Sequence, residues 1–223
     1  MLIVGHRGAR AYAPENTLAS FQKALEIGVD AVELDVRRTK DGQLIVMHDA
    51  DVKRTTNGKG LVSDLTLEQI KGLSNQGEKV PTLCEALDFL KGKAKVLIEL
   101  KETGYEEQVL AEVEKRGMEK NVIVTSFHDD AIKKVRQLND TIETGLIYAK
   151  HSNPLKAAVE LKANYLLPLY RFTHTANVEK AHGKGLKVIV WTINTPEEAA
   201  EYAKKGVDGI ASDKPDILKA LNA

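Results

Sequence analysis

The sequence has little of several features that would direct attention to one kind of protein. It has a single cysteine, Cys84, among 223 residues, so no disulfide can form within the chain. Its 32 basic and 32 acidic residues cancel, and no basic stripe or polybasic tail favours nucleic acid or an anionic membrane surface. No apolar run approaches the length of a membrane-spanning helix. The apolar residues 2–5 lead straight into His6, which leaves no room for a signal peptide. We therefore expect a cytoplasmic chain without nucleic-acid binding or stable membrane association.

The most informative stretch is the first fifty residues. Glu33 and Asp35 are two positions apart in an apolar run, so they are predicted to share one face of a strand. Asp41-Gly42 between alternating apolar residues predicts a hairpin with a two-residue loop. That register places His48 directly opposite Asp35, on the face that carries Glu33. Two carboxylates with a histidine beside them suit a hard metal ion and proton transfer.

Short β-branched runs alternate with longer amphipathic ones along the whole chain, which is typical of a parallel sheet with crossover helices. The strand candidates are residues 2–5, 31–37, 43–48, 96–101, 122–126, 143–148, 164–168, 187–193 and 208–211. The helix candidates between them are residues 18–27, 83–91, 105–116, 129–138, 154–162, 175–184 and 196–205.

The hairpin decides how these strands are counted. It makes 31–37 and 43–48 antiparallel, and we take 43–48 as an arm outside the main sheet. Eight strands remain, which predicts an α/β fold of the (β/α)8 TIM-barrel type. The runner-up fold is an open doubly wound sheet, which should have a glycine-rich phosphate turn after its first strand. Gly5-His6-Arg7-Gly8 is not the usual pattern for such a turn.

We expect one domain over residues 1–223. Residues 49–80 interrupt the alternation, contain a short helix candidate at 66–73, and are too long for a simple connection between a strand and a helix. We interpret them as a small insertion after the second strand, over the barrel mouth. A longer surface loop is the alternative.

Polar and charged residues gather where the predicted strands end. In a parallel barrel, chemistry takes place at the carboxyl ends of the strands. Each of these residues alone has a simpler structural explanation, such as a core histidine or an exposed ion pair. Acids inside apolar runs are costly unless they are paired or bound to a metal, and the joint pattern therefore favours a functional site. The residues concerned are His6, Arg7, Glu33, Asp35, Glu99, Lys101, Ser126, Trp191 and Asn194.

A series of motifs in this order resembles the glycerophosphodiester phosphodiesterase family from end to end. The motifs are His6-Arg7-Gly8, Pro14-Glu15-Asn16-Thr17, Glu33-x-Asp35-Val36, Asp41-Gly42 leading to His48-Asp49, Arg54-Thr55-Thr56-Asn57-Gly58, Pro81-Thr82-Leu83, Glu99-x-Lys101, Trp191-Thr192-x-Asn194, and Asp208-Gly209-Ile210 with Ser212-Asp213-x-Pro215. One modest departure is Lys214, where the family often has arginine before the late proline.

The resemblance implies a (β/α)8 barrel with an insertion after the second strand, and it implies roles for particular residues. These are a divalent metal on Glu33, Asp35 and Glu99, catalytic work by His6 and His48, and phosphate binding near Arg7 and Lys101. Carboxylates without a histidine or cysteine ligand pattern favour Mg²⁺ or Ca²⁺ over Zn²⁺. Trp191 would form an apolar wall for the glycerol carbons. Either histidine can serve as the base.

The expected activity is metal-dependent hydrolysis of glycerophosphodiesters to glycerol 3-phosphate and an alcohol. A lysophospholipase-D-like activity on lysophospholipids is one alternative. It needs an apolar surface at the mouth, and Tyr170 and Phe172 are the only obvious aromatic candidates for one. A non-catalytic barrel that binds a phosphorylated ligand is the other alternative. Loss of a histidine or acid would indicate such a barrel, and none is missing. The substrate is expected to be a small molecule, with the head group, the choice between Mg²⁺ and Ca²⁺, and the oligomeric state left open.

Overall fold

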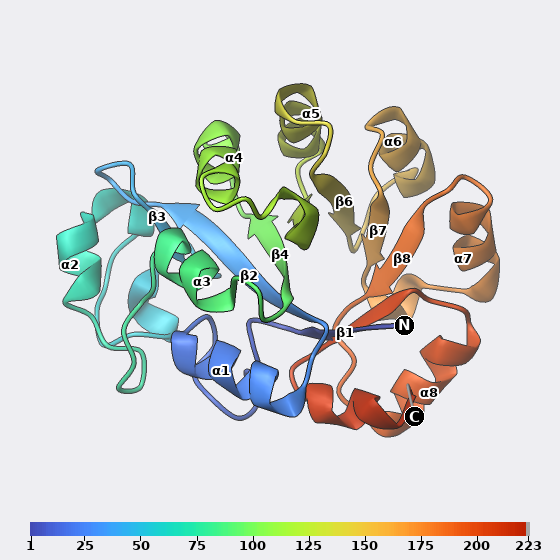
Figure 1. Cartoon of the computed structure of the whole chain (residues 1–223), viewed down its shortest axis with the longest axis horizontal. Helices are drawn as coiled ribbons and strands as arrows, with labels where there is room; N and C mark the ends of the chain where they lie inside the picture. Colours follow the sequence, from blue (N-terminus) through green and yellow to red (C-terminus); the bar gives the residue numbers. More distant parts are fainter. Residues whose placement is uncertain (222–223) are drawn as a thin grey trace.

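The computed structural model describes residues 1–221 and is a closed barrel of strands surrounded by helices (Figure 1). The strands are β1 (Leu2–Gly5), β2 (Ala31–Arg38), β3 (Leu44–Val46), β4 (Lys95–Leu100), β5 (Val122–Ser126), β6 (Glu143–Tyr148), β7 (Tyr165–Pro168), β8 (Lys187–Val190) and β9 (Gly209–Ser212). The α-helices are α1 (Leu18–Ile27), α2 (Leu67–Lys71), α3 (Leu83–Leu90), α4 (Glu106–Glu114), α5 (Asp129–Leu138), α6 (Pro154–Glu160), α7 (Thr175–His182) and α8 (Pro196–Lys204). None of the helices in residues 1–221 is long and apolar enough to cross a bilayer.

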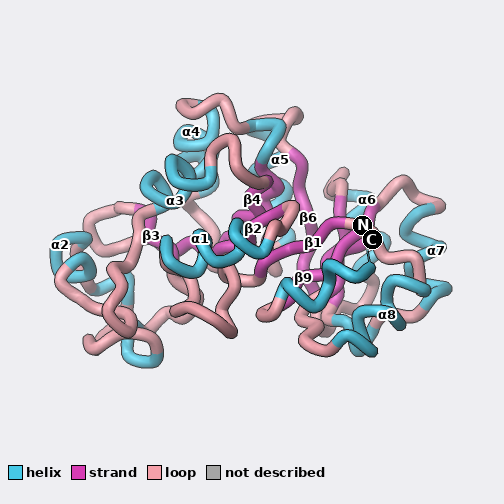
Figure 2. Tube along the Cα trace, turned by 60° about the horizontal axis from the view of Figure 1, so that its bottom comes forward, coloured by secondary structure: helices cyan, strands magenta, loops and turns pink. Residues whose placement is uncertain are grey.

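Eight parallel strands close the barrel in the order β1-β9-β8-β7-β6-β5-β4-β2, because β1 also pairs with β2. The ninth strand, β3, lies antiparallel to the carboxyl-terminal half of β2, with Val36 opposite Val46. The predictions of an eight-stranded barrel and of an antiparallel arm are both confirmed. Figure 2 shows the strands at the centre with helices around them.

The hairpin register predicted from Asp41-Gly42 is wrong by one residue. Thr39 and Gln43 form the closing pair, with Thr39 N donating to Gln43 O at 2.9 Å, so the loop has three residues. Gly42 takes a left-handed conformation (φ 78°) at its end, as a three-residue hairpin loop requires. Met47 therefore lies opposite Asp35, to whose carbonyl it donates at 2.9 Å.

The core has separate layers inside and outside the barrel wall. The shell between strands and helices is the larger layer and includes Phe21, Leu34, Leu87 and Leu100, all with no exposed surface. The barrel interior is filled by alternate residues of the same strands, since successive side chains of a strand point to opposite faces. This interior cluster comprises Val4, Ala31, Leu97, Ile123, Ile147, Tyr165, Leu167, Ile189 and Ala211.

The segment that follows β3 has a small core of its own. Val52, Val62 and, from α2, Ile70 are buried there together with Ile45 of β3. The segment lies on the side of the barrel opposite α7 in both views (Figures 1 and 2). It touches the loop between β1 and α1, because Asn75 Nδ2 donates to the backbone oxygen of that loop's Glu15 at 3.1 Å.

The loop from β1 to α1 is held by local contacts that the sequence encodes. Thr17 caps α1, and its hydroxyl accepts from the amide of Ser20. Ser20 Oγ donates to the carbonyl of Arg7 at 2.9 Å and accepts from the amide of Ala9. Gly8 sits against this contact with φ 89°, so a side chain has no room there.

Replacing Gly8 by alanine is expected to destabilise the fold much more than replacing Gly42. Both residues have positive φ, which costs alanine about 1–2 kcal/mol. At Gly42 a new Cβ meets nothing within 4 Å, whereas at Gly8 it would lie 2.4 Å from Ser20 Oγ and 2.6 Å from the Ser20 backbone carbon. That clash should remove about 1–3 kcal/mol more from the free energy of unfolding. Urea denaturation measures both losses, and equal losses would contradict this account of the loop.

Candidate active site

Three buried carboxylates meet inside the carboxyl end of the barrel. Glu33 and Asp35 point to the same face of β2, and Glu99 is the cross-strand partner of Asp35 on β4. One carboxylate oxygen of each lies within 4.8 Å of the others. The three residues are only 7%, 1% and 9% exposed. Oε1 of Glu33 is buried without a hydrogen-bond partner, which leaves it available to a ligand.

Two basic side chains lie against these acids. Lys101 Nζ donates to Glu99 and lies 3.4 Å from Asp35 Oδ1. Arg7 Nε is 3.3 Å from Asp35 Oδ2, and the Arg7 amide donates to Glu33 Oε2 at 2.8 Å. Glu33 thus accepts a hydrogen bond from the backbone, whereas the side chains of Arg7 and Lys101 lie against the other two acids, Asp35 and Glu99.

The surroundings of the three acids shift their pKa values in different directions. Burial raises the pKa of Glu33 well above its ordinary value, and the neighbouring Asp35 and Glu99 raise it further. Burial and Asp35 raise the pKa of Glu99 to about 7. Burial would also raise the pKa of Asp35, but Lys101 and Arg7 hold it below its ordinary value. A buried carboxylate cluster of this kind favours an added cation, so the donor set fits a hard divalent metal ion.

His6 directly follows β1 and is oriented by an acid from the end of the chain. Its Nδ1 lies 2.6 Å from Oδ1 of Asp213, which follows β9. Asn194 Nδ2 donates to the other oxygen of Asp213 at 2.9 Å. Nε2 of His6 faces the acid cluster, 4.0 Å from Glu33 Oε2. Burial lowers the pKa of His6, so the ring is neutral near pH 7.

His48 reaches the same site by a different route from the one predicted. The strand β3 ends at Val46, so the position of the ring does not follow from the ladder. The backbone oxygen of His48 instead accepts from Arg37 Nε at 2.9 Å. Nδ1 of His48 lies 2.6 Å from Oδ1 of Asp49. Burial lowers the pKa of His48, with Lys101 adding to the effect.

A cavity of about 150 Å³ lies between these groups. One wall is charged and polar, with His6, Arg7, Glu33, His48, Glu99 and Lys101. The lining also has an apolar wall, formed by residues of the barrel interior: Leu97, Ile147, Leu167, Ile189 and Ala211. Trp191 completes that wall, and its Nε1 donates to the carbonyl of Leu167 at 2.7 Å. Asp35 lies behind the charged wall, against Arg7 and Lys101.

Two of the polar strand-end residues have supporting positions instead. Ser126 Oγ donates to the carbonyl of Leu100 at 2.8 Å, and Asn194 holds Asp213. Neither lines the cavity.

The aromatic residues at the mouth are not those expected from the sequence. Phe127 lines the cavity, is 43% exposed, and packs edge-on against Trp191 with ring centroids 5.7 Å apart. Phe172 lies instead beside Tyr148 in a separate hollow. Tyr170 packs against Tyr202. Phe127 directly follows Ser126 at the end of β5, and that position at a strand end is the signal that could have found it.

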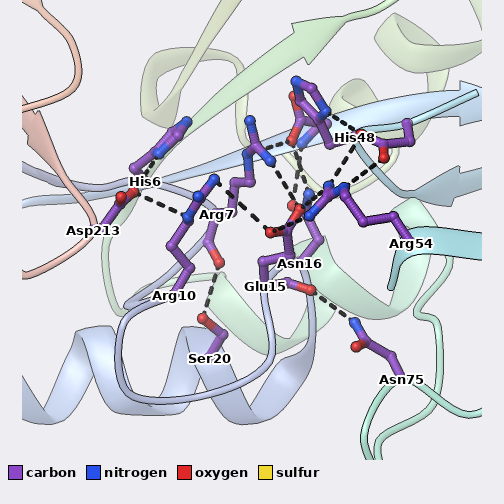
Figure 3. A network of polar contacts seen from close by, with 12 residues as sticks. His6, Arg7, Arg10, Glu15, Asn16, Ser20, His48, Arg54, Asn75 and Asp213 are labelled. Carbon is purple, nitrogen blue, oxygen red and sulfur yellow. Dashed lines mark hydrogen bonds and ion pairs between the residues drawn. The ribbon is translucent and has the colours of Figure 1, made fainter. Parts of the chain in front are cut away.

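Several further residues support the site. Asn16 Nδ2 donates to Asp35 Oδ2 at 2.8 Å, and Glu15 accepts from Arg7 Nη1 at 2.8 Å. Figure 3 shows Glu15 and Asn16 between Arg7 on one side and Arg54 on the other. All of these residues stand in motifs of the sequence. The Arg7–Glu15 contact lies within one loop, whereas the contacts of Asn16 with Asp35 and of Glu15 with Arg54 join different segments of the chain.

The comparisons with known proteins bear on this arrangement. The sequence model of the "Glycerophosphoryl diester phosphodiesterase family" matches residues 6–217. The chain belongs to this family. A "Glycerophosphodiester phosphodiesterase" of Caldanaerobacter subterraneus subsp. tengcongensis is 37% identical, over 97% of this chain and 96% of that protein.

Solved structures of similar proteins have the same fold. The glycerophosphodiester phosphodiesterase of Thermotoga maritima has a TM-score of 0.87 and 31% identity, covering 99% of this chain and 98% of that one. A phosphodiesterase of Oleispira antarctica has a TM-score of 0.91 and 28% identity, covering 100% and 97%. The latter structure is a complex with the product sn-glycerol-3-phosphate. The predictions of family and barrel fold are confirmed.

Proposed function

We propose that the protein hydrolyses glycerophosphodiesters to glycerol 3-phosphate and an alcohol with the help of a divalent metal ion. The observation that carries the proposal is the cavity lined by two of the three clustered carboxylates, Glu33 and Glu99, and by two histidines that are each paired with an aspartate. Family membership supports the reaction class, and the product bound to the Oleispira antarctica relative supports a small phosphorylated substrate.

Glu33, Asp35 and Glu99 would hold the metal ion, and an all-carboxylate donor set favours Mg²⁺ or Ca²⁺. When bound, such an ion supplies Lewis-acid polarisation of the phosphoryl group and a template for the substrate. The unpartnered Oε1 of Glu33 and the raised pKa of the Glu33 and Glu99 carboxyls, which has burial as its main cause, support this assignment.

Arg7 and Lys101 are assigned to the phosphate. Both line the cavity and both are largely buried, which strengthens their attraction for an anion. Arg7 offers a planar fork of donors for phosphoryl oxygens, and Lys101 offers a point charge. Their acidic partners keep the two cations in place before substrate binds.

His6 and His48 are assigned to proton transfer. Each places Nδ1 against an aspartate, so Nδ1 carries the proton and Nε2 presents its lone pair. The ring that acts as base accepts the proton of the attacking hydroxyl on Nε2, and the ring that acts as acid, which first takes up a second proton from water on Nε2, delivers that proton to the departing alcohol. The aspartate stabilises the imidazolium form of its partner during each transfer. Trp191 would line the glycerol carbons.

Diesters should be much better substrates than monoesters. A monoester carries one more negative charge than a diester near neutral pH and has no second alcohol to leave, so it gains nothing from the second histidine. Release of glycerol phosphate from glycerophosphocholine and glycerophosphoethanolamine, compared with phosphate release from glycerol phosphate, measures the preference. Comparable kcat/KM values for both classes would contradict the assignment. A lysophospholipid in the same panel tests the alternative activity, for which the exposed Phe127 is the one favourable feature.

The neighbouring glycerol hydroxyl is the proposed nucleophile, giving a cyclic phosphate that water then opens. This hydroxyl is part of the substrate and lies close to the phosphorus, and His6 or His48, both of which line the cavity, can accept its proton. An analogue in which this hydroxyl is replaced by hydrogen should be cleaved at a small fraction of the parent's rate. Cleavage at a similar rate would exclude the cyclic route and leave direct attack by water.

A further inference from the structure

A chain of polar contacts connects Glu15, outside the cavity, to His48 (Figure 3). Arg54 donates to the two carboxylate oxygens of Glu15 at 2.7 and 3.0 Å. The same guanidinium donates to both oxygens of Asp49, at 2.5 and 3.0 Å. Asp49 then pairs with Nδ1 of His48 at 2.6 Å. Glu15 is thus joined to the imidazole through two planar bidentate contacts, the geometry in which arginine is most selective.

A second chain connects the same carboxylate to His6. Arg10 Nη1 lies 3.8 Å from Glu15 Oε2, and Arg10 Nε lies 3.2 Å from Asp213 Oδ1. Asp213 in turn pairs with Nδ1 of His6 at 2.6 Å. The two series of contacts are alike, because in each of them one arginine and one aspartate lie between Glu15 and a histidine.

Glu15 is nearly buried, whereas the two arginines are partly exposed. Its side chain is 12% exposed, and those of Arg10 and Arg54 are 32% and 47% exposed. Arg7 and Asn75 also bond Glu15, one at its carboxylate and one at its backbone oxygen. Burial would raise the pKa of Glu15, but hydrogen bonds from Arg54 and the charge of Arg7 lower it to about 2. Glu15 is therefore an ionised, fixed point against which two long, partly exposed side chains are ordered.

We propose that Glu15 is a positioning residue that sets the orientation of both His6 and His48, acting through Arg10 and Arg54. An aspartate held by arginine offers a fixed acceptor to Nδ1–H, which keeps Nε2 directed into the cavity. Loss of the Glu15 charge frees both arginines, so both rings should change together. The catalytic consequence rests on the proposed function, whereas the effect on the rings does not.

Nitrogen chemical shifts of the two rings test the proposal without an activity assay. Protein labelled with ¹⁵N-histidine is recorded with Mg²⁺ present, and the resonances are assigned with His6 and His48 variants. Glu15→Gln should shift the Nδ1–H tautomer toward the Nε2–H form in both rings. Arg54→Gln should affect only His48, and Arg10→Gln only His6. The two arginine variants carry the test even where Glu15→Gln folds poorly, which thermal unfolding checks.

Kinetics give the second measurement. Outer partners of site residues usually contribute about 10- to 100-fold, so Glu15→Gln should lower kcat by that factor. If Glu15 acted only through Arg7, which is assigned to the phosphate, Glu15→Gln would raise KM instead of lowering kcat. The Glu15→Gln/Arg54→Gln double variant should lose less than the product of the single losses, because both changes act on His48. Glu112→Gln is the matched control: Arg116 bridges Glu112 and Asp88 as Arg54 bridges Glu15 and Asp49, but away from the cavity.

Each result decides the proposal. Joint tautomer shifts in Glu15→Gln with single shifts in the arginine variants support it. Unchanged rings in Glu15→Gln overturn it, as does an arginine variant that moves both rings equally. Joint shifts without any diesterase activity in the unmodified protein would leave Glu15 as a positioning residue and refute the proposed function instead.

Discussion

Alanine at either His6 or His48 should lower kcat by a factor of about one hundred or more, since each ring supplies one proton transfer of the proposed reaction. Truncation removes Nε2 and leaves the aspartate without its imidazole partner, although Asp213 keeps its contacts with Arg10 and Asn194 and Asp49 keeps those with Arg54. Neither aspartate belongs to the acid cluster. Metal affinity, measured by calorimetry, should therefore change little in both variants, while kcat on a glycerophosphodiester falls.

The chain contains a matched control for this experiment. His182 pairs through Nε2 with Asp208 at 2.8 Å, but Asp208 precedes β9 and so lies at the opposite end of the barrel. His182→Ala removes an imidazole from an aspartate without touching the cavity, and kcat should stay at the unmodified level. Near-normal turnover of His6→Ala or His48→Ala would make that histidine structural and remove it from the mechanism.

Removing the divalent metal should abolish activity altogether, and returning Mg²⁺ or Ca²⁺ should restore it. Without the ion, burial and mutual repulsion leave the pKa of Glu33 well above its ordinary range and that of Glu99 at about 7. The charge that the site directs at a phosphate then comes only from Arg7 and Lys101, both already paired with acids. Chelation followed by dialysis, with elemental analysis of the treated protein, provides the test. Full turnover in verified metal-free protein would refute metal dependence.

The variant Glu99→Gln tests metal binding at one of the three proposed ligands. Glutamine keeps the shape of the side chain and removes its charge, so the barrel should fold while metal affinity falls at least about tenfold. Glu106→Gln is a suitable control, because Glu106 is also a buried acid, 5% exposed, but it bonds the Gly104 amide outside the cluster. Equal metal affinity of Glu99→Gln and Glu106→Gln, measured by calorimetry, would exclude Glu99 as a ligand.

The local features of the fold could be predicted from the sequence. Strand and helix bounds differ from the predicted ones by at most three residues. The hydrophobic periodicity of each segment reports which face is buried, and that signal depends on neighbouring residues alone. The side-by-side placement of Glu33 and Asp35 follows from the alternation of a strand in the same way. The count of eight strands required only that one hairpin be recognised.

Contacts between distant segments depended on the tertiary structure. The hairpin register differed by one residue because a three-residue loop replaced the expected two-residue one. Gly42 has a positive φ in either loop, but a two-residue type I′ turn also requires a positive φ at Asp41, which Asp41 does not adopt. His48 nevertheless enters the site, because Arg37 holds its backbone after β3 has ended. That contact lies beyond the last residue pair of the strand ladder.

The sequence by itself determined the barrel, the family and most of the residues that line the cavity. The tertiary structure decided which of them touch. His6 and Asp213 are 207 positions apart, and Glu15 and Arg54 are 39 positions apart. Phe127, and not Phe172, lies at the mouth. The physical reason is that side-chain contacts across a closed barrel depend on strand order, register and loop conformation together, whereas periodicity reports only one segment at a time.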